Sequence, residues 1–267
     1  MTDGRKTTLK SLADRKRAGE PITMLTAYDA SLARIMDRAG VDCILVGDSL
    51  GNVIQGRDTT VPVTLDDMVY HVGCVRRGVE RAMLIGDMPF LSYSDRESAI
   101  DSARRLMQAG AEMVKLEGGA PVIEIVEALT VLGVPVCGHL GLTPQSVHQL
   151  SGYRVQGRER RAREQLVTDA GELAGAGAAM LVLECVPARL AAEVAARIEI
   201  PVVGIGAGVD VDGQVLVGYD ALGISAGPRP RFVRDFLAGR GSVEAAVSAF
   251  IEAVRAREFP GAGESYD

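Results

Sequence analysis

The sequence predicts an α/β protein built as a single (β/α)8 barrel. Eight short apolar runs recur along the 267 residues, which allows about 33 residues for each strand–helix unit. Each run is apolar throughout rather than alternating with polar residues, which is typical of a strand buried on both faces of a parallel sheet. Helix-like segments separate the runs, and the length suits a barrel of roughly 250 residues.

The elements follow in order from the N-terminus. A helix is expected before Pro21, and crossover helices are expected at 64–79, 94–109 and 160–176. Capping boxes predict two of their starts, one at Thr64 with Asp67 and one at Ser94 with Glu97. The strands are expected near 22–27, 42–47, 82–86, 112–117, 134–138, 179–184, 201–205 and 221–225.

The C-terminal part is expected to add helices from about 230 to 258, followed by a frayed end, PGAGESYD. No linker or break in composition divides the chain, so 1–267 is interpreted as one domain. A doubly wound open sheet is the competing fold. It is disfavoured because no G-x-G-x-x-G follows the first strand, and the glycine-rich GIGAG follows only the seventh.

Composition excludes several classes of partner. The net charge is −6 and no block of basic residues occurs, which argues against nucleic acid and anionic membranes. The longest uncharged stretch, 128–153, is broken by Pro135 and Pro144 and cannot be a membrane span. No apolar run follows the basic residues near the N-terminus, so we expect a cytoplasmic protein without a secretory signal. Its four cysteines lack C-x-x-C spacing and are interpreted as reduced, packed thiols.

Ionisable residues gather where five consecutive strands are expected to end. All these strand ends meet at one mouth of a barrel, where active sites of this fold are built. A single charged strand end could be a solvated terminus, but five in succession favour a functional site. The residues are Asp48, Asp87, Lys115, Glu117, His139 and Glu184.

Three of these carboxylates predict a metal site. Asp48, Asp87 and Glu117 offer oxygen ligands alone, which suits Mg²⁺ and leaves positions for a bidentate 2-keto acid. Lys115 is one of only four lysines beside 25 arginines. A compact ammonium at this position favours contact with a substrate anion, the alternative being an ion pair with a neighbouring carboxylate.

Glu184 ends the most apolar of the acidic strands, AMLVLE. Burial is expected to raise its pKa toward neutrality and so to make it a general base. With a cation polarising a ketone, that base could remove the adjacent proton. His139 is open to two interpretations, a hydrogen-bond donor to substrate or a packed residue.

Long motifs around these residues resemble the ketopantoate hydroxymethyltransferase family. They span from about Thr26 to Gly227 and occur in the order in which the family has them. The most specific are VGDSLGNVIQGRDTTVPVTLDDM at Val46, GDMPFLSY at Gly86, AGAEMVKLEGG at Ala109, VPVCGHLGLTPQSV at Val134 and LVLECVP at Leu181.

The resemblance implies a reaction, a cofactor and residue roles. The family transfers a hydroxymethyl group from 5,10-methylenetetrahydrofolate to 3-methyl-2-oxobutanoate, giving 2-dehydropantoate for pantothenate biosynthesis. It implies one Mg²⁺ per subunit, a TIM barrel of the phosphoenolpyruvate/pyruvate superfamily type, and a homodecamer. Asp48, Asp87 and Glu117 match the metal site, with Asp48 and Asp87 also contacting the keto acid through the ion. Ser49 and Lys115 match substrate contacts, and Glu184 the proton acceptor.

Three other functions compete with this one. A related Mg²⁺-dependent lyase or mutase acting on a small 2-keto acid would use Cys137 as acid–base residue, although a packed thiol is the simpler interpretation. A phosphate site at GIGAG and SAGPRP would predict a phosphorylated ligand. A non-catalytic metabolite-binding barrel would have no use for Glu184.

Overall fold

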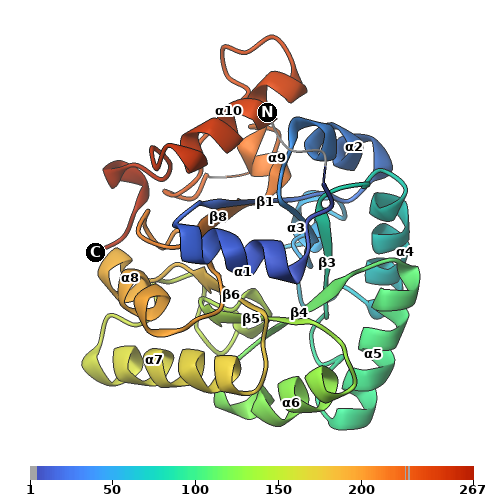
Figure 1. Ribbon diagram of the computed structural model, residues 1–267, viewed down its shortest axis with the longest axis vertical. Helices are drawn as coiled ribbons and strands as arrows, with labels where there is room; N and C mark the ends of the chain where they lie inside the picture. The colour runs from blue at the N-terminus through green and yellow to red at the C-terminus, as the bar shows by residue number, and fades with distance from the viewer. Residues whose placement is uncertain (1–4, 226, 228) are drawn as a thin grey trace.

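The computed structural model describes residues 5–225, 227 and 229–267 (Figure 1). Eight parallel strands close into a barrel in sequence order, with the last strand paired to the first, which confirms the predicted fold class. The strands are β1 (Ile22–Thr26), β2 (Cys43–Val46), β3 (Met83–Asp87), β4 (Met113–Glu117), β5 (Val136–Gly141), β6 (Met180–Glu184), β7 (Val202–Ile205) and β8 (Gly213–Leu216).

Helices surround the barrel, and their apolar faces cover the outer faces of the strands (Figure 1). The α-helices are α1 (Leu9–Ala18), α2 (Ala30–Ala39), α3 (Leu50–Val53), α4 (Leu65–Arg76), α5 (Arg96–Ala109), α6 (Ile123–Val131), α7 (Arg160–Gly175), α8 (Ala188–Arg197), α9 (Gly218–Ala221) and α10 (Val243–Arg255). Three short 3₁₀ helices are η1 (Ala120–Val122), η2 (Pro144–Ser146) and η3 (Ala262–Glu264). No helix in the part of the chain that the structure describes is both long and apolar enough to cross a bilayer.

One of the two predicted capping boxes is confirmed and the other is displaced by one residue. Thr64 caps α4 and pairs reciprocally with Asp67. The cap of α5 is Asp95, whose partner is Ser98, rather than Ser94 with Glu97. An aspartate accepts hydrogen bonds from the first turn at least as well as a serine, and it is the residue that adopts the extended cap conformation here.

The eighth strand was predicted at the wrong place. It lies at Gly213–Leu216, whereas 221–225 follows it in the end of α9 and the turn beyond. The run is short and is interrupted by Gln214, so it does not look like a buried strand in sequence. The side chain of Gln214 is nevertheless buried, because its Nε2 donates to the carbonyl of Gly208 at 2.9 Å.

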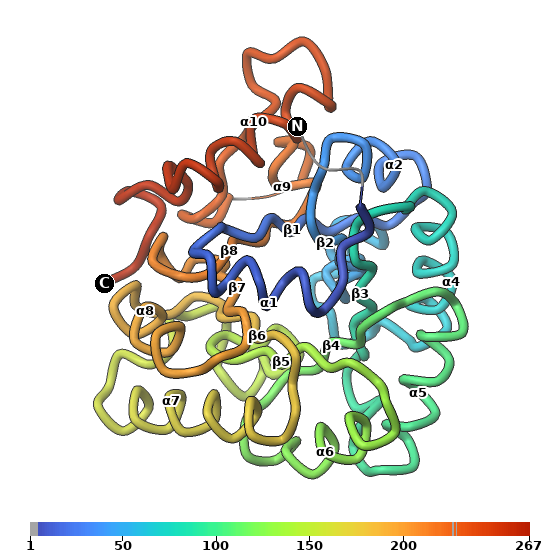
Figure 2. Tube along the Cα trace, in the orientation of Figure 1, coloured from blue at the N-terminus to red at the C-terminus, as the bar shows by residue number. Residues whose placement is uncertain are grey.

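The C-terminal region also differs from expectation. One helix, α10, replaces the helices expected over 230–258, and residues 230–242 form turns and irregular backbone. The end of the chain is docked rather than frayed. Glu264 is paired with Arg234 at 2.6 Å, and the backbone N–H of Ala188 donates to the carbonyl of Tyr266 at 2.9 Å. The C-terminus accordingly lies beside α8 (Figure 2).

The N-terminal helix α1, which was predicted, lies across the strand-entry end of the barrel (Figure 1). Basic residues in and just before it pair with acidic residues that precede three different strands. These pairs are Lys6 with Glu112, Arg15 with Asp42 and Lys16 with Asp212. Two of the four lysines, Lys6 and Lys16, therefore serve this end and Lys10 lies on the same helix, which leaves Lys115 alone at the other end.

Candidate active site

A cavity of about 940 Å³ opens at the carboxyl ends of the strands. Register explains why the predicted residues meet there, since Asp87 pairs with Lys115 on the next strand and Glu117 pairs with His139 on the one after. All the residues predicted for the site line this cavity. They are Asp48, Ser49, Asp87, Lys115, Glu117, His139 and Glu184.

Lys115 forms the electrostatic centre of the cavity floor. Its Nζ donates to Asp87 Oδ2 at 2.6 Å and lies 3.9 Å from Glu117 Oε1. Burial alone would lower the pKa of this amine, but Asp87, Glu117 and Asp48 outweigh burial and raise it. Lys115 is therefore a cation at neutral pH. The ion-pair alternative considered for this residue is present, and the same ammonium also faces the cavity.

His139 lies between two carboxylates and is almost fully buried. Its Nδ1 is 3.1 Å from Glu117 Oε1, and its Nε2 is 3.3 Å from Glu184 Oε2, although the second contact lacks hydrogen-bond geometry. Burial and Lys115 lower its pKa, but Glu117 and Glu184 outweigh them and raise it to about 9. The imidazolium therefore links the floor of the cavity to Glu184.

Glu184 reaches the cavity from the end of β6 and keeps 16% of its side chain exposed. The following residue, Cys185, has a positive φ of 47°, a backbone conformation that residues other than glycine rarely adopt. On the neighbouring strand, a Cβ on Gly141 would lie 2.2 Å from the carbonyl oxygen of Glu184. A glycine is therefore required for the backbone that presents this carboxylate.

Ser49 is oriented by a chain of hydroxyl groups. The backbone N–H of Gly218 donates to Thr26 Oγ1, which donates to the hydroxyl of Tyr28 at 2.8 Å. The Tyr28 hydroxyl lies 2.8 Å from Ser49 Oγ. Either oxygen can be the donor of this second hydrogen bond; when Tyr28 donates, the proton of the Ser49 hydroxyl is left for a ligand in the cavity.

Gln145 is a site residue that the sequence did not single out. Its Nε2 donates to Asp48 Oδ2 at 2.9 Å and to the carbonyl of Met88 at 3.0 Å, and its Oε1 accepts from the Tyr93 hydroxyl at 2.6 Å. Its backbone N–H donates to Glu117 Oε2 at 3.0 Å. One buried glutamine thus holds carboxylates from the ends of two strands. Its place in GLTPQSV, after the fifth strand, was the available signal.

The carboxylates fit a hard cation in charge and in donor type. Burial, and then the negative charges of Asp87 and Glu117, raise the pKa of Asp48 to about 8. Asp87 Oδ1 is buried without a hydrogen-bond partner. Among the residues that the structure describes, no group of three or more His, Cys, Asp or Glu side chains has the arrangement of a metal site. A bound cation would therefore stabilise the carboxylate oxygens of Asp48 and Asp87 the most.

The residues on which two rival hypotheses depend, Cys137 for a lyase or mutase and GIGAG for a phosphate site, have packing roles in the structure. Cys137 is fully buried, and burial raises the pKa of its thiol to about 12. In GIGAG, a Cβ on Gly206 would lie 2.8 Å from the ring of Phe232, and one on Gly208 would lie 2.4 Å from Ala188 Cβ. These glycines permit close packing of loops. The other proposed phosphate segment, SAGPRP, contains positions 226 and 228, which lie outside the described residues.

Comparison with known proteins identifies the family of the chain. The sequence profile described as ketopantoate hydroxymethyltransferase matches residues 6–262. The 3-methyl-2-oxobutanoate hydroxymethyltransferase of Idiomarina loihiensis is 54% identical over 98% of each chain. That of Methylococcus capsulatus is 54% identical over all of this chain and 98% of its own.

Solved structures with lower identity share the fold. A phosphonopyruvate hydrolase in complex with oxalate and Mg²⁺ has a TM-score of 0.59 at 12% identity, covering 78% of this chain and 80% of the other. A 2,3-dimethylmalate lyase, described as a member of the PEP mutase/isocitrate lyase superfamily, has a TM-score of 0.57 at 17% identity, covering 81% and 83%. These structures show the fold alone, whereas the profile match and the identities above 50% show that the chain belongs to the ketopantoate hydroxymethyltransferase family of enzymes.

Proposed function

We propose that this enzyme transfers a hydroxymethyl group from 5,10-methylenetetrahydrofolate to 3-methyl-2-oxobutanoate, giving 2-dehydropantoate for pantothenate biosynthesis. The observation that carries the proposal is that a candidate base, Glu184, and a buried ammonium, Lys115, face the same cavity. The relatives named 3-methyl-2-oxobutanoate hydroxymethyltransferase support the acceptor. The homodecamer and the cytoplasmic location stay predictions from the family resemblance.

A Mg²⁺ ion held by Asp48 and Asp87 would polarise the ketone and stabilise negative charge on its oxygen. Support comes from the unpartnered oxygen of Asp87 and the raised pKa of Asp48. Glu117 has both oxygens engaged, with His139 and with the backbone of Gln145, so it would act at the ion through a water molecule. The phosphonopyruvate hydrolase structure, which contains oxalate and Mg²⁺ on the same fold, supports a cation beside a dicarbonyl ligand.

The protein's own groups bind the acid and move the proton. Lys115 and the hydroxyl of Ser49 hold the carboxylate of the keto acid, because both present N–H or O–H groups to the cavity. Glu184 takes the proton from C3, and His139 beside it stabilises the carboxylate before the transfer. Water adds to the methylene carbon of the donor as the two bonds from that carbon to the folate nitrogens break, and the two protons of the water go to those nitrogens. The carbon–carbon bond then forms between C3 and the carbonyl carbon so released, and Glu184 returns the C3 proton to the new hydroxyl oxygen.

The first half of this reaction can be tested without the folate. With the keto acid in D₂O and Mg²⁺, the wild type should exchange the C3 proton, and Glu184→Gln should lower the exchange rate by about 10²-fold or more. Mg²⁺ binding, followed by calorimetry, should be largely retained in that variant. An unchanged exchange rate in Glu184→Gln would refute the role of Glu184 as the base. Exchange that persists in a chelator would refute the role of the cation.

A further inference from the structure

The cavity has two zones of different chemistry. Its floor holds the charged residues described above, whereas its mouth combines exposed apolar side chains with a few polar groups. Three of the nine large apolar side chains that are exposed in the described chain line this one mouth. They are Ile54, Tyr153 and Ile224, exposed by 39%, 55% and 56%. Solvent-exposed apolar groups gathered around a cavity are typical of a surface that a ligand covers.

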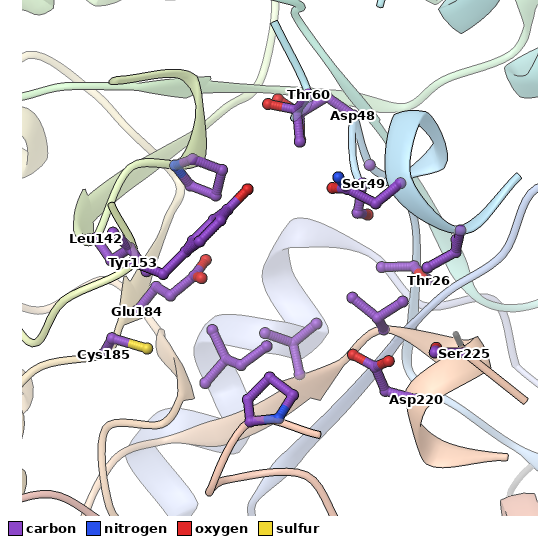
Figure 3. A pocket seen from close by; sticks show the side chains of 18 of the residues that line it. Thr26, Asp48, Ser49, Thr60, Leu142, Tyr153, Glu184, Cys185, Asp220 and Ser225 are labelled. Atoms are coloured by element: carbon purple, nitrogen blue, oxygen red, sulfur yellow. The ribbon is translucent and has the colours of Figure 1, made fainter. Parts of the chain in front are cut away.

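Tyr153 connects the two zones. In Figure 3 its ring extends into the cavity above Glu184. Burial, and then the charges of Glu184, Asp48 and Glu117, raise the pKa of its hydroxyl. The negative charges of these carboxylates therefore act on the Tyr153 hydroxyl, while 55% of the residue remains exposed to solvent and can contact a ligand. A flat ring stacked on Tyr153 would be placed directly beside Glu184.

Asp220 is a carboxylate of the cavity that the proposed reaction does not use. It lies on α9, on the opposite side of the cavity from Tyr153, and its side chain points inward (Figure 3). The cation that influences it, Arg229, is itself paired with Asp235 at 2.9 Å. Burial raises the pKa of Asp220, and the adjacent Ser225 hydroxyl lowers it, although the contact between the two lacks the geometry of a normal hydrogen bond. Asp220 and Ser225 are thus the polar groups that this side of the mouth presents to a ligand.

We propose that Asp220 and Tyr153 form the subsite for the pterin ring of the one-carbon donor. Asp220 accepts hydrogen bonds from two adjacent N–H groups at the ring edge, and Tyr153 stacks on the ring face. This assignment rests on the proposed function, which supplies a folate as second substrate. A 2-amino-4-oxopyrimidine edge carries such a pair of donors, and a carboxylate can accept both in parallel.

The surroundings of these two residues match the rest of a folate. Arg154, next to Tyr153, lies at the same mouth and is exposed. Its guanidinium suits the carboxylates of the glutamate tail, which would extend outward from the ring. Ile54 and Ile224 would cover the apolar surface between the ring and the tail. The subsite therefore places the methylene group of the donor between the mouth and the floor.

The test compares binding of tetrahydrofolate by equilibrium dialysis with turnover and with C3 exchange of the keto acid. Asp220→Asn keeps the shape of the side chain but replaces one acceptor oxygen by a donor, so the Kd for tetrahydrofolate should rise by about ten-fold or more. Tyr153→Leu should raise it by about five-fold or more, and Tyr153→Phe should bind like the wild type. Asp58→Asn is the matched control, since Asp58 is an exposed carboxylate at the same mouth.

Exchange of the keto acid needs no donor and reports whether the floor of the cavity is intact in each variant. Weakened folate binding in Asp220→Asn and Tyr153→Leu, with exchange retained, would support the subsite. Wild-type affinity in both variants would overturn the subsite while leaving the proposed function standing. Failure of the wild type itself to bind tetrahydrofolate would overturn the subsite and the folate half of the proposed function together.

Discussion

Replacing Gln145 by leucine tests whether one amide holds the carboxylates of the proposed metal site in place. The change removes a donor from Asp48 Oδ2, another from the carbonyl of Met88, and the acceptor of the Tyr93 hydroxyl. A hydrogen bond to a charged group contributes about 1.5–3 kcal/mol and a neutral one about 1 kcal/mol. The free energy of unfolding should therefore fall by about 3.5–5 kcal/mol, which lowers Tm by roughly 7–20 °C at this chain length.

The functional effect should exceed the loss of stability. With Asp48 no longer oriented, the affinity for Mg²⁺ should fall by about 10–100-fold, as for other residues that hydrogen-bond metal ligands. Mg²⁺ titration of turnover and calorimetry measure this change, and scanning calorimetry measures Tm. Gln165→Leu is the matched control, because Gln165 donates to Asp169 at the same 2.9 Å but on the exposed face of α7. Equal Mg²⁺ affinity in Gln145→Leu and wild type would refute the reasoning.

Two further predictions concern the cavity floor, and a third concerns a thiol in the core. In a chelator, Asp48→Asn should raise Tm at pH 8, because the raised pKa of Asp48 means that ionising this carboxyl destabilises the folded protein as the pH rises from about 4 through about 8. In Mg²⁺, where the wild type turns over, the same variant should be inactive. A Tm equal to wild type would show that the repulsion is absent. Lys115→Met should destabilise the protein by about 3–5 kcal/mol in denaturant titrations, because it leaves Asp87 buried and unpaired; a change below 1 kcal/mol would contradict the ion pair. Cys137→Ser should retain turnover, and loss of turnover in a folded variant would revive the lyase or mutase hypothesis.

The site residues at the strand ends could be predicted because a barrel brings these ends together regardless of the conformation of the loops. Asp87, Lys115 and Glu117 each belong to a strand, and strand register alone sets them next to one another. Their ionisable character at the ends of apolar runs is visible in one sequence. The role of His139 as the link between Glu117 and Glu184 was not visible, since it depends on side-chain geometry across three strands.

Residues in loops could not be predicted in the same way. Gln145 reaches Asp48 across 97 positions of sequence, and no periodicity connects the two. Strand β8 was missed for a related reason, because the polar Gln214 is tolerated inside it through a single hydrogen bond to Gly208. A pattern of apolar and polar residues records burial only on average, so a polar side chain whose partner lies elsewhere in the chain escapes it.

The docked C-terminus makes the last residues of the chain part of the cavity. Tyr266 lines the same space as Glu184, and it is held there by the backbone of Ala188 and, through Glu264, by Arg234. Protein engineers should therefore attach affinity tags at the other end. A fusion or a protease nick after Gly261 would act on substrate access without touching any residue that performs chemistry.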